Sequence, residues 1–326
     1  MKRLLMLLAV LAGVFSAVAA HADRQRILVI HSYDPGLPWV AQCNRGIDGV
    51  LAELVELERV YLDTKRIHRS EFQARADKAM QFYERFKPDL VMVGDDDALR
   101  LLGPRIAATG KPLVYFGINN NPREYFSRMP DNVTGVLERV PVFAWIRHLK
   151  RIVPGAENAL VLLDGSATAE AVISVAFGDR MELSVDGVRV EYKVAADWAQ
   201  WQRVILSPHG FDFITMPLYH DLKDDAGVHV PVEEVVRWTT ENSSVPVFAY
   251  QDYAVGDNGV VGAFVIFGET HAQLAALMAR DILEGKNPRL PTAYMDQDGM
   301  FFFNESRLTR FGLTLPEDIR RKAVFR

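Results

Sequence analysis

The segment RILVIHSYDPGLPW, residues 26–39, begins with an apolar run and ends in a loop that holds two prolines and a glycine. The uninterrupted run predicts a buried β-strand over residues 26–33. Proline and glycine are typical of a rigid turn. Beyond the turn, apolar residues recur at helical spacing from Trp39 to Leu54, which predicts an amphipathic helix. The segment therefore has the pattern of a β-α unit.

The same alternation of apolar runs and helical periods continues along most of the chain. Strand-like runs occupy residues 60–63, 88–94, 112–117 and 133–136, and again 159–164, 188–192, 211–216, 245–250 and 259–267. Helical periods lie at residues 72–86, 98–106, 168–183, 198–206 and 269–284. Strands separated by helices of this length predict parallel sheets covered on both faces. The restart near residue 159 predicts two successive halves, and the expected fold class is α/β.

The first 22 residues have the pattern of a secretory signal peptide. Lys2 and Arg3 precede an uncharged apolar run over residues 4–20, and Ala20-His21-Ala22 matches a small-x-small cleavage site. We expect cleavage after Ala22. The alternative is an uncleaved membrane anchor, because the apolar run approaches the length that spans a bilayer. The pattern predicts an exported protein.

Composition narrows the class of partner. The chain has 326 residues, with 37 Lys and Arg against 42 Asp and Glu, and its formal net charge is −5. Binding to nucleic acid or anionic lipid by a basic surface needs clustered Lys and Arg, so we expect no nucleic-acid partner. Cys43 is the single cysteine, which excludes an intrachain disulfide. Stability must therefore come from a packed core.

Polar and aromatic residues follow the predicted strands, which is where parallel α/β sheets bind their ligands. The most conspicuous group is Asp95-Asp96-Asp97. An aspartate after a strand commonly caps the next helix, but a carboxylate here would equally suit an ammonium or hydroxyl group of a ligand. A metal or phosphoryl-transfer site is a third interpretation. Tyr33 and Trp39 suit either stacking on a ligand or packing in the core.

No catalytic motif accompanies these residues. The sequence lacks a G-x-S-x-G elbow, a Walker G-x-x-x-x-G-K-[ST], a G-x-G-x-x-G after the first strand and an H-E-x-x-H pair. No second group of His or acidic residues has the spacing of metal ligands. We therefore assign no catalytic residue, no metal and no cofactor.

Several motifs together resemble a known family. They are HSYDPGLPW at 31–39, YLDTKR at 61–66, GDDDA at 94–98, FGIN at 116–119 and VTGVLE at 133–138. The chain resembles the type 1 periplasmic binding proteins over nearly its whole mature length. Within them it is similar to the ABC-transporter substrate-binding family of tryptophan/tyrosine type, and to related periplasmic sensor regions of bacterial signalling proteins. It departs from the transporter relatives at 95–97, where they carry small hydroxyl residues.

The resemblance implies two Rossmann-like parallel-sheet lobes joined by a three-crossover hinge that closes over a ligand. The first lobe is expected to hold residues 23–137 plus about 256–290, and the second residues 138–255 plus about 291–326. Carried over by position, the ligand-binding residues of the first lobe and its crossover are Ser32, Tyr33, Trp39, Asp95, Asp96, Asn119 and Glu138. Strand-end position alone adds Asp164, Tyr219, Tyr250 and Asp252 on the second lobe or the hinge.

The function implied is that of a periplasmic solute-binding protein, not an enzyme. It would capture a small polar organic ligand between its lobes and present it to an ABC permease, touching the membrane only through that partner. The first alternative is a ligand-sensing component that a membrane sensor kinase reads. Two further alternatives are an exported metal-dependent hydrolase and an interaction module that binds no small molecule.

Overall fold

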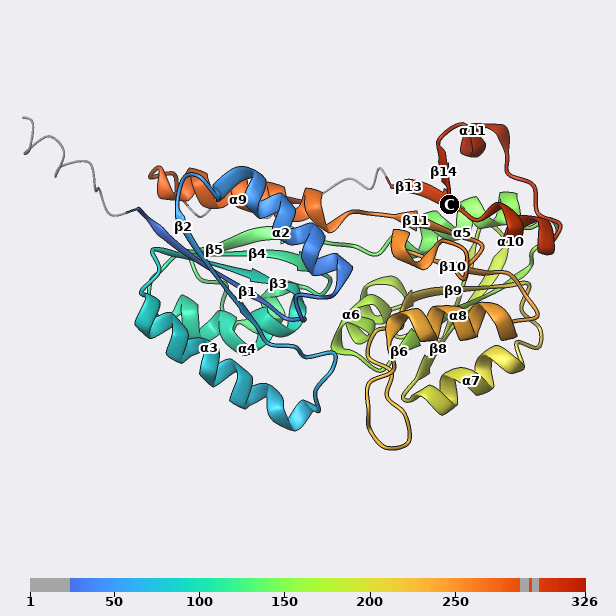
Figure 1. Cartoon of the computed structure of the whole chain (residues 1–326), viewed down its shortest axis with the longest axis horizontal. Coiled ribbons are helices and arrows are strands. Elements are labelled where there is room, and N and C mark those ends of the chain that lie inside the picture. The colour runs from blue at the N-terminus through green and yellow to red at the C-terminus, as the bar shows by residue number, and fades with distance from the viewer. Residues whose placement is uncertain (1–23, 288–292, 295–298) are drawn as a thin grey trace, which may run out of the picture.

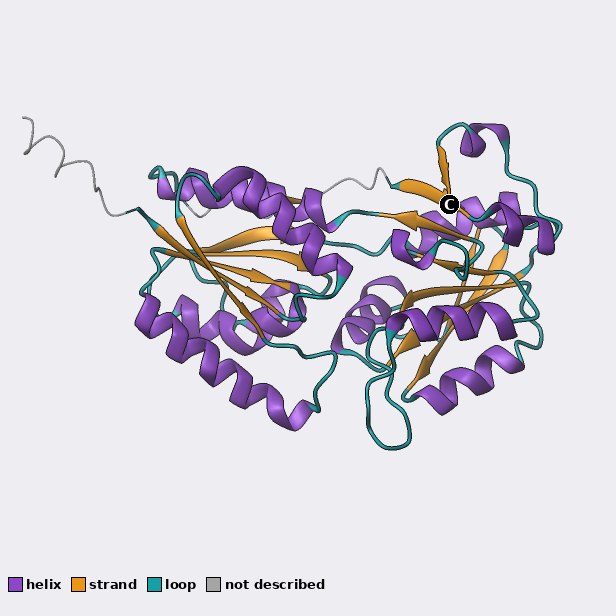
Figure 2. Ribbon diagram, in the orientation of Figure 1, coloured by secondary structure: helices purple, strands orange, loops and turns teal. Residues whose placement is uncertain are grey.

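The computed structural model describes residues 24–287, 293–294 and 299–326, and the predicted signal peptide lies outside them. Two β-sheets lie side by side along the long axis of the molecule, each with helices on both faces (Figure 1, Figure 2). None of the helices within these described residues is long and apolar enough to cross a membrane. The predicted α/β class with two lobes is confirmed.

The first sheet is parallel throughout, with the strand order β2-β1-β3-β4-β5-β12. Its strands are β1 (Arg26–His31), β2 (Glu56–Tyr61), β3 (Leu90–Gly94), β4 (Leu113–Ile118), β5 (Val133–Leu137) and β12 (Ala293–Tyr294). Alternate residues of β1 point to opposite faces, so Leu28 and Ile30 enter one core cluster while Ile27 and Val29 enter the other. Burial on both faces explains the unbroken apolar run in the sequence.

Helices cover both faces of the first sheet. They are α2 (Pro38–Leu51), α3 (Phe72–Phe86), α4 (Asp95–Ala107) and α9 (Gly268–Leu283), with short 3₁₀ turns η1 (Arg69–Glu71) and η2 (Pro122–Tyr125). Helices α2 and α9 pack together over one face, although they are far apart in the sequence (Figure 1). Their contact needs a glycine, because a Cβ at Gly46 would lie 2.2 Å from the carbonyl oxygen of Glu269.

The second sheet repeats this plan and extends it at both edges, in the order β7-β8-β6-β9-β10-β11-β13-β14. Its central strands run parallel, while β7 is antiparallel to β8 and β13 is antiparallel to β11. The strands are β6 (Asn158–Asp164), β7 (Glu182–Val185), β8 (Val188–Ala195), β9 (Phe213–Leu218), β10 (Val247–Ala249), β11 (Gly262–Val265), β13 (Met300–Phe303) and β14 (Ala323–Phe325).

The helices of the second half divide between the two faces of this sheet. They are α5 (Val142–Ile152), α6 (Ala167–Ala176), α7 (Trp198–Leu206), α8 (Val232–Asn242), α10 (Glu305–Arg310) and α11 (Glu317–Arg320), with the 3₁₀ turn η3 (Asp252–Ala254). Trp145 of α5 anchors one core cluster and Trp201 of α7 the other. Helices α7 and α8 lie on the same side of the sheet (Figure 1).

The chain passes between the sheets three times, but two of the expected boundaries shift. Strand β11 pairs with β10 in the second sheet, so residues 256–265 belong with the second lobe rather than the first. Strand β12 pairs with β5, so residues 293–294 lie with the first lobe rather than the second. The apolar run at 259–267 marked the strand correctly. Which of the two sheets this strand joins depends on its pairing in three dimensions, and the apolar periodicity of the sequence does not indicate that pairing.

Candidate functional site

A cavity lies between the two lobes, against the connections that join them. Its empty space is about 690 Å³, open solvent at its mouth included. We call it the inner chamber. Its lining comes from both lobes and from two of the crossovers: Tyr33, Leu37, Trp39, Gln42, Lys65, Asp95, Asn119, Glu138, Val140, Pro141, Thr168, Leu218, His220, Tyr250, Gln251, Asp252, Tyr253, Val265 and Ile266.

Seven of the eleven predicted residues line the inner chamber. They are Tyr33, Trp39, Asp95, Asn119, Glu138, Tyr250 and Asp252. The other four, Ser32, Asp96, Asp164 and Tyr219, are buried close by but do not line it. Nine of the eleven residues follow a strand or begin a crossover, while Asp164 is the last residue of β6 and Trp39 lies in the first turn of α2.

Asp95 and Trp39 form one wall of the chamber. Trp39 Nε1 donates to Asp95 Oδ1 at 2.9 Å, whereas Asp95 Oδ2 is buried and has no hydrogen-bond partner. The backbone of Asp95 has φ +67°, a conformation that aspartate and asparagine tolerate better than most residues. Gly117 opposite has φ +68°, and a Cβ there would lie 3.2 Å from Asp95 Oδ1. The glycine of the FGIN motif thus leaves room for this carboxyl group.

Asn119 and Glu138 continue this wall toward the first crossover. Asn119 Nδ2 donates to Glu138 Oε2 at 3.3 Å, and Asn119 Oδ1 is buried without a partner. Burial, with repulsion from Asp96, raises the pKa of Glu138 from 4.5 to about 8. Burial, with repulsion from Glu138 and Asp96, raises the pKa of Asp95 well above its ordinary value. The wall therefore gathers hydrogen-bond acceptors. Ionising its two carboxyl groups, Asp95 and Glu138, is costly unless a cation lies beside them.

The opposite wall comes from the second lobe. Gln251 donates through Nε2 to the Pro217 carbonyl oxygen at 2.8 Å, and its Oε1 is buried without a partner. Asp252 Oδ1 accepts from Gln42 Nε2 across the lobes at 3.2 Å. His220 Nε2 lies 2.8 Å from Tyr253 Oη, and burial lowers the pKa of this histidine to about 3. The imidazole is therefore neutral at neutral pH.

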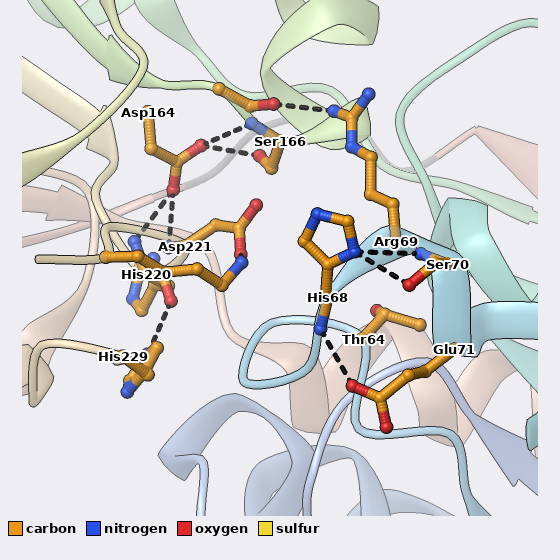
Figure 3. A network of polar contacts seen from close by, with 12 residues as sticks. Thr64, His68, Arg69, Ser70, Glu71, Asp164, Ser166, His220, Asp221 and His229 are labelled. Atoms are coloured by element: carbon orange, nitrogen blue, oxygen red, sulfur yellow. Dashed lines mark hydrogen bonds and ion pairs between the residues drawn. The ribbon is translucent and has the colours of Figure 1, made fainter. Parts of the chain in front are cut away.

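A second, outer chamber adjoins the inner one, and we call the residues that line both chambers the neck. Tyr33, Lys65 and Thr168 line both chambers, and Tyr33 Oη lies 2.9 Å from Thr168 Oγ1 across the lobes. Nearer the surface, Arg69 Nη2 donates to the Gly165 carbonyl oxygen at 2.7 Å (Figure 3). These contacts hold the two lobes together over the inner chamber.

Ser32 has a structural role in place of the predicted ligand contact. Its hydroxyl donates to the Gly94 carbonyl oxygen at 2.7 Å and accepts from the Ala98 backbone N–H at 2.8 Å. Its hydroxyl therefore ties the first turn of α4 to the loop after β1 through both the Ala98 N–H and the Gly94 carbonyl oxygen. The interpretation of the aspartate run as a cap of its own helix was wrong, because no side chain caps α4 from the N-cap position, Gly94.

Asp96 and Asp164 hold equivalent loops in the two lobes. Asp96 accepts from the backbone N–H groups of Asn119 and Asn120, each at 3.0 Å. Asp164 accepts from those of His220 and Asp221, at 2.8 and 2.9 Å (Figure 3). Each carboxylate thus fixes the loop after a neighbouring strand instead of lining the chamber.

Tyr219 packs into the core between the second sheet and the helices α7 and α8. It is fully buried, and its ring stacks on His220 with the centroids 4.2 Å apart. Strand-end position does not distinguish it from its neighbour His220, which does line the chamber. Both residues lie beyond β9, which ends at Leu218, so the alternation of side chains along the strand does not decide which of the two reaches the chamber.

Sequence analysis missed several lining residues, among them Gln42, Lys65, Thr168, Gln251 and Tyr253. Lys65 stands in the YLDTKR motif, so a signal was present. Gln42 lies within α2, and no group of polar residues around it in the sequence indicates a binding site. In the described part of the chain, no group of three or more His, Cys, Asp or Glu side chains is placed to hold a metal ion.

No family model and no curated protein matches the sequence. Solved structures do match. An ABC domain in complex with L-Trp from Streptococcus pneumonia has a TM-score of 0.70 at 18% identity, covering 93% of this chain and 99% of that one. A conserved domain protein from Vibrio cholerae has a TM-score of 0.68 at 18% identity, with the same coverage. A ligand-free, open substrate-binding protein with adhesive properties from Clostridium difficile has a TM-score of 0.60 at 19% identity, again with 93% and 99% coverage.

These likenesses extend over almost the whole chain and over both lobes. Further matches include solute-binding proteins of ABC transporters. The chain therefore has the type 1 periplasmic binding protein fold, as the resemblance of its motifs predicted.

Proposed function

We propose that the chain is an exported solute-binding protein that captures a small polar organic ligand in the inner chamber and presents it to an ABC permease. One observation carries the proposal. Asp95 Oδ2 and Asn119 Oδ1 from the first lobe, and Gln251 Oε1 from the second, are buried acceptors that lack a donor within the described chain. A buried polar atom without a partner is costly, and a ligand with donor groups would satisfy all three.

The acceptor set defines the ligand's chemistry. Asp95 and Glu138 are neighbouring buried carboxyl groups with raised pKa values, so a cation between them would recover the cost of ionising them. An ammonium group supplies both the positive charge and several donors. Tyr33 and Trp39 add flat apolar surface to the same chamber. We infer a ligand with an amine, or a set of hydroxyl groups, on a compact carbon skeleton.

Capture requires both lobes. A ligand favours a closed state only if it binds that state better than the open one, and acceptors from opposite lobes supply this difference. Tyr33–Thr168 and Gln42–Asp252 already link the lobes around the chamber. Hinge closure of this kind is common among two-domain binding proteins.

The comparisons and the N-terminal pattern support this proposal. One structural neighbour is described in complex with L-Trp, a molecule that carries an ammonium group. The predicted signal peptide supports export to the periplasm, where a permease would receive the solute. The resemblance to sensor regions keeps a membrane sensor kinase as the alternative partner, since it would read the same closed state.

Thermal unfolding tests the binding function. The mature protein would be unfolded and refolded to remove carried ligand, then heated with amino acids, amines, nucleobases, sugars and small carboxylates. A ligand at about 100 times its Kd adds roughly 2.7 kcal/mol, which raises Tm by several degrees. We expect at least one donor-bearing compound to do so.

Two variants connect any shift to the chamber. Asp95→Asn keeps the shape and tolerates the positive φ, but it removes the charge and should abolish most of the shift. Glu53→Gln, on the exposed turn after α2, is the matched control and should leave the shift unchanged. A flat panel with wild-type protein, or a shift that survives in Asp95→Asn, would contradict the proposal.

A further inference from the structure

Lys65 is a buried cation whose amine has no hydrogen-bond partner. Its side chain is 6% exposed, and Nζ is buried without an acceptor in the described chain. The loop is fixed immediately before it, because both the backbone N–H and the hydroxyl of Thr64 donate to the Ser32 carbonyl oxygen. The amine is therefore held at a defined place by a rigid support.

The contacts of the amine locate it at the neck between the two chambers. Nζ lies 4.5 Å from the centre of the Tyr33 ring, and Lys65 lines both the inner and the outer chamber. Tyr33 Oη and Thr168 Oγ1, which bond each other across the lobes, border the same neck. A cation over a ring face is stabilised in part, but its three N–H donors still require acceptors.

Three carboxyl groups lie within electrostatic reach of Lys65, and two of them, Asp164 and Asp221, are engaged by other partners. Asp164 accepts from the backbone of Ser166, His220 and Asp221 (Figure 3). Asp221 pairs with Lys223 at 2.9 Å, and the bonded oxygen of Asp95 faces Trp39. Among the described residues, no ion pair joins any of them to Lys65. Asp164, Asp95 and Asp221 lie within electrostatic reach of Lys65 and offset part of its charge, but none of them accepts a hydrogen bond from the amine. Buried N–H donors without an acceptor are costly, so the amine calls for an acceptor that the described chain does not supply.

We propose that Lys65 Nζ binds a negatively charged group of the ligand, a carboxylate or a phosphate, at the neck of the cleft. The inference rests on the proposed function and deepens it. The inner end of the site offers acceptors and the neck offers a donor with positive charge, so the ligand has two unlike ends and a fixed orientation. Its donor groups face Asp95 and Asn119, and its anionic group faces Tyr33 and Thr168.

Matched pairs of probes test the anionic group. Calorimetric titration of refolded wild-type protein would compare L-tryptophan with L-tryptophanamide, L-lactate with L-lactamide, glucuronate with glucose, and ribose 5-phosphate with ribose. Within any pair that binds, the acidic member should bind about 10- to 100-fold more tightly, the range for a hydrogen bond to a charged group. The first three pairs report a carboxylate and the last a phosphate.

Lys65→Met removes the charge and keeps the length of the side chain. It should abolish the preference for the acidic member while retaining binding of the neutral one. Lys78→Met, an exposed lysine on α3 of the same lobe, is the control and should keep the preference. Because the wild-type comparison needs no variant, a folding defect in Lys65→Met would not remove the test.

The outcomes separate this inference from the proposed function. Equal affinity for acidic and neutral members in wild-type protein, or a preference that survives in Lys65→Met, overturns the role of Lys65 while solute binding stands. If no member of any pair binds and the thermal panel is flat, the proposed function fails and the anionic subsite fails with it.

Discussion

Glu138 is a buried carboxyl group at the start of the first crossover, where it lines the inner chamber. Burial and the charge of Asp96 raise its pKa to about 8, so the folded protein at neutral pH holds a proton that an unfolded chain would release. Burial thus strains the ionised form of Glu138, which a ligand cation would stabilise. Strained electrostatics of this kind is common at functional sites.

Replacing Glu138 should change how stability depends on pH. A folded pKa of about 8 against 4.5 unfolded contributes stability that is present below pH 4.5 and is lost as pH rises through 8. Over about pH 5 to 8, ligand-free wild-type protein should therefore lose up to a few kcal/mol relative to Glu138→Gln, since each pKa unit is worth about 1.4 kcal/mol.

Urea unfolding of both proteins at several pH values measures this difference. The neutral histidines His31 and His220 titrate in the opposite direction and are common to the two proteins. Asp95 titrates in the same direction as Glu138, and because Glu138 helps to raise its pKa, Glu138→Gln also reduces the contribution of Asp95. Parallel stability profiles for wild type and Glu138→Gln would show that Glu138 is not the group responsible.

Single residues also show what sequence could and could not predict. Trp39, Asp95 and Asn119 line the chamber as expected, because the ends of parallel strands converge. Ser32 follows the same strand as Tyr33, yet its hydroxyl is used by α4. Lys65 lay in a recognised motif, but its missing partner is visible only in three dimensions. Strand-end logic finds a region, whereas hydrogen bonding decides which side chains remain free.

Helix α4 depends on a cap that comes from outside its own sequence. Ser32 Oγ accepts from Ala98 N–H, so the loop after β1 fixes the start of the helix after β3. The three aspartates at its beginning face inward and are buried. This arrangement frees Asp95 for the chamber and Asp96 for the neighbouring loop.

Ser32→Ala should therefore destabilise the fold without altering the chamber's lining. The substitution removes the two hydrogen bonds of the Ser32 hydroxyl, to the Gly94 carbonyl oxygen and from the Ala98 N–H, which costs about 1–2 kcal/mol. Equilibrium urea denaturation would measure the change, with the exposed Ser127→Ala as the control that should have almost no effect. A stability equal to wild type would refute the structural role and return Ser32 to the list of ligand contacts.

Elements differed in how well the sequence predicted them. The buried central strands were readily recognised, because burial on both faces gives long apolar runs. The predicted helix at 168–183 in fact ends at Ala176, and β7 begins at Glu182. The turn between them contains Gly178 with φ +59°, a signal that the apolar pattern concealed. Short edge strands such as β7 and β14 lack a period long enough to detect.

The whole molecule is two versions of one parallel plan, with the carboxyl ends of both sheets turned toward a shared cleft. Asp96 and Asp164 have the same role in the two halves. Each accepts hydrogen bonds from the backbone of a loop beside the inner chamber and so fixes that loop. The order of lobes followed from the repeated β-α pattern. The boundaries at β11 and β12 did not, because they depend on which sheet a short strand joins.

Small-angle X-ray scattering tests most directly whether the two lobes capture a solute between them. The refolded, ligand-free protein would be measured alone and with the compound from the thermal panel that raises Tm most. Because the chamber's free acceptors come from both lobes, the radius of gyration should fall on addition of that compound. An unchanged radius of gyration, together with a clear rise in Tm, would contradict capture by closure and place the ligand on one lobe alone.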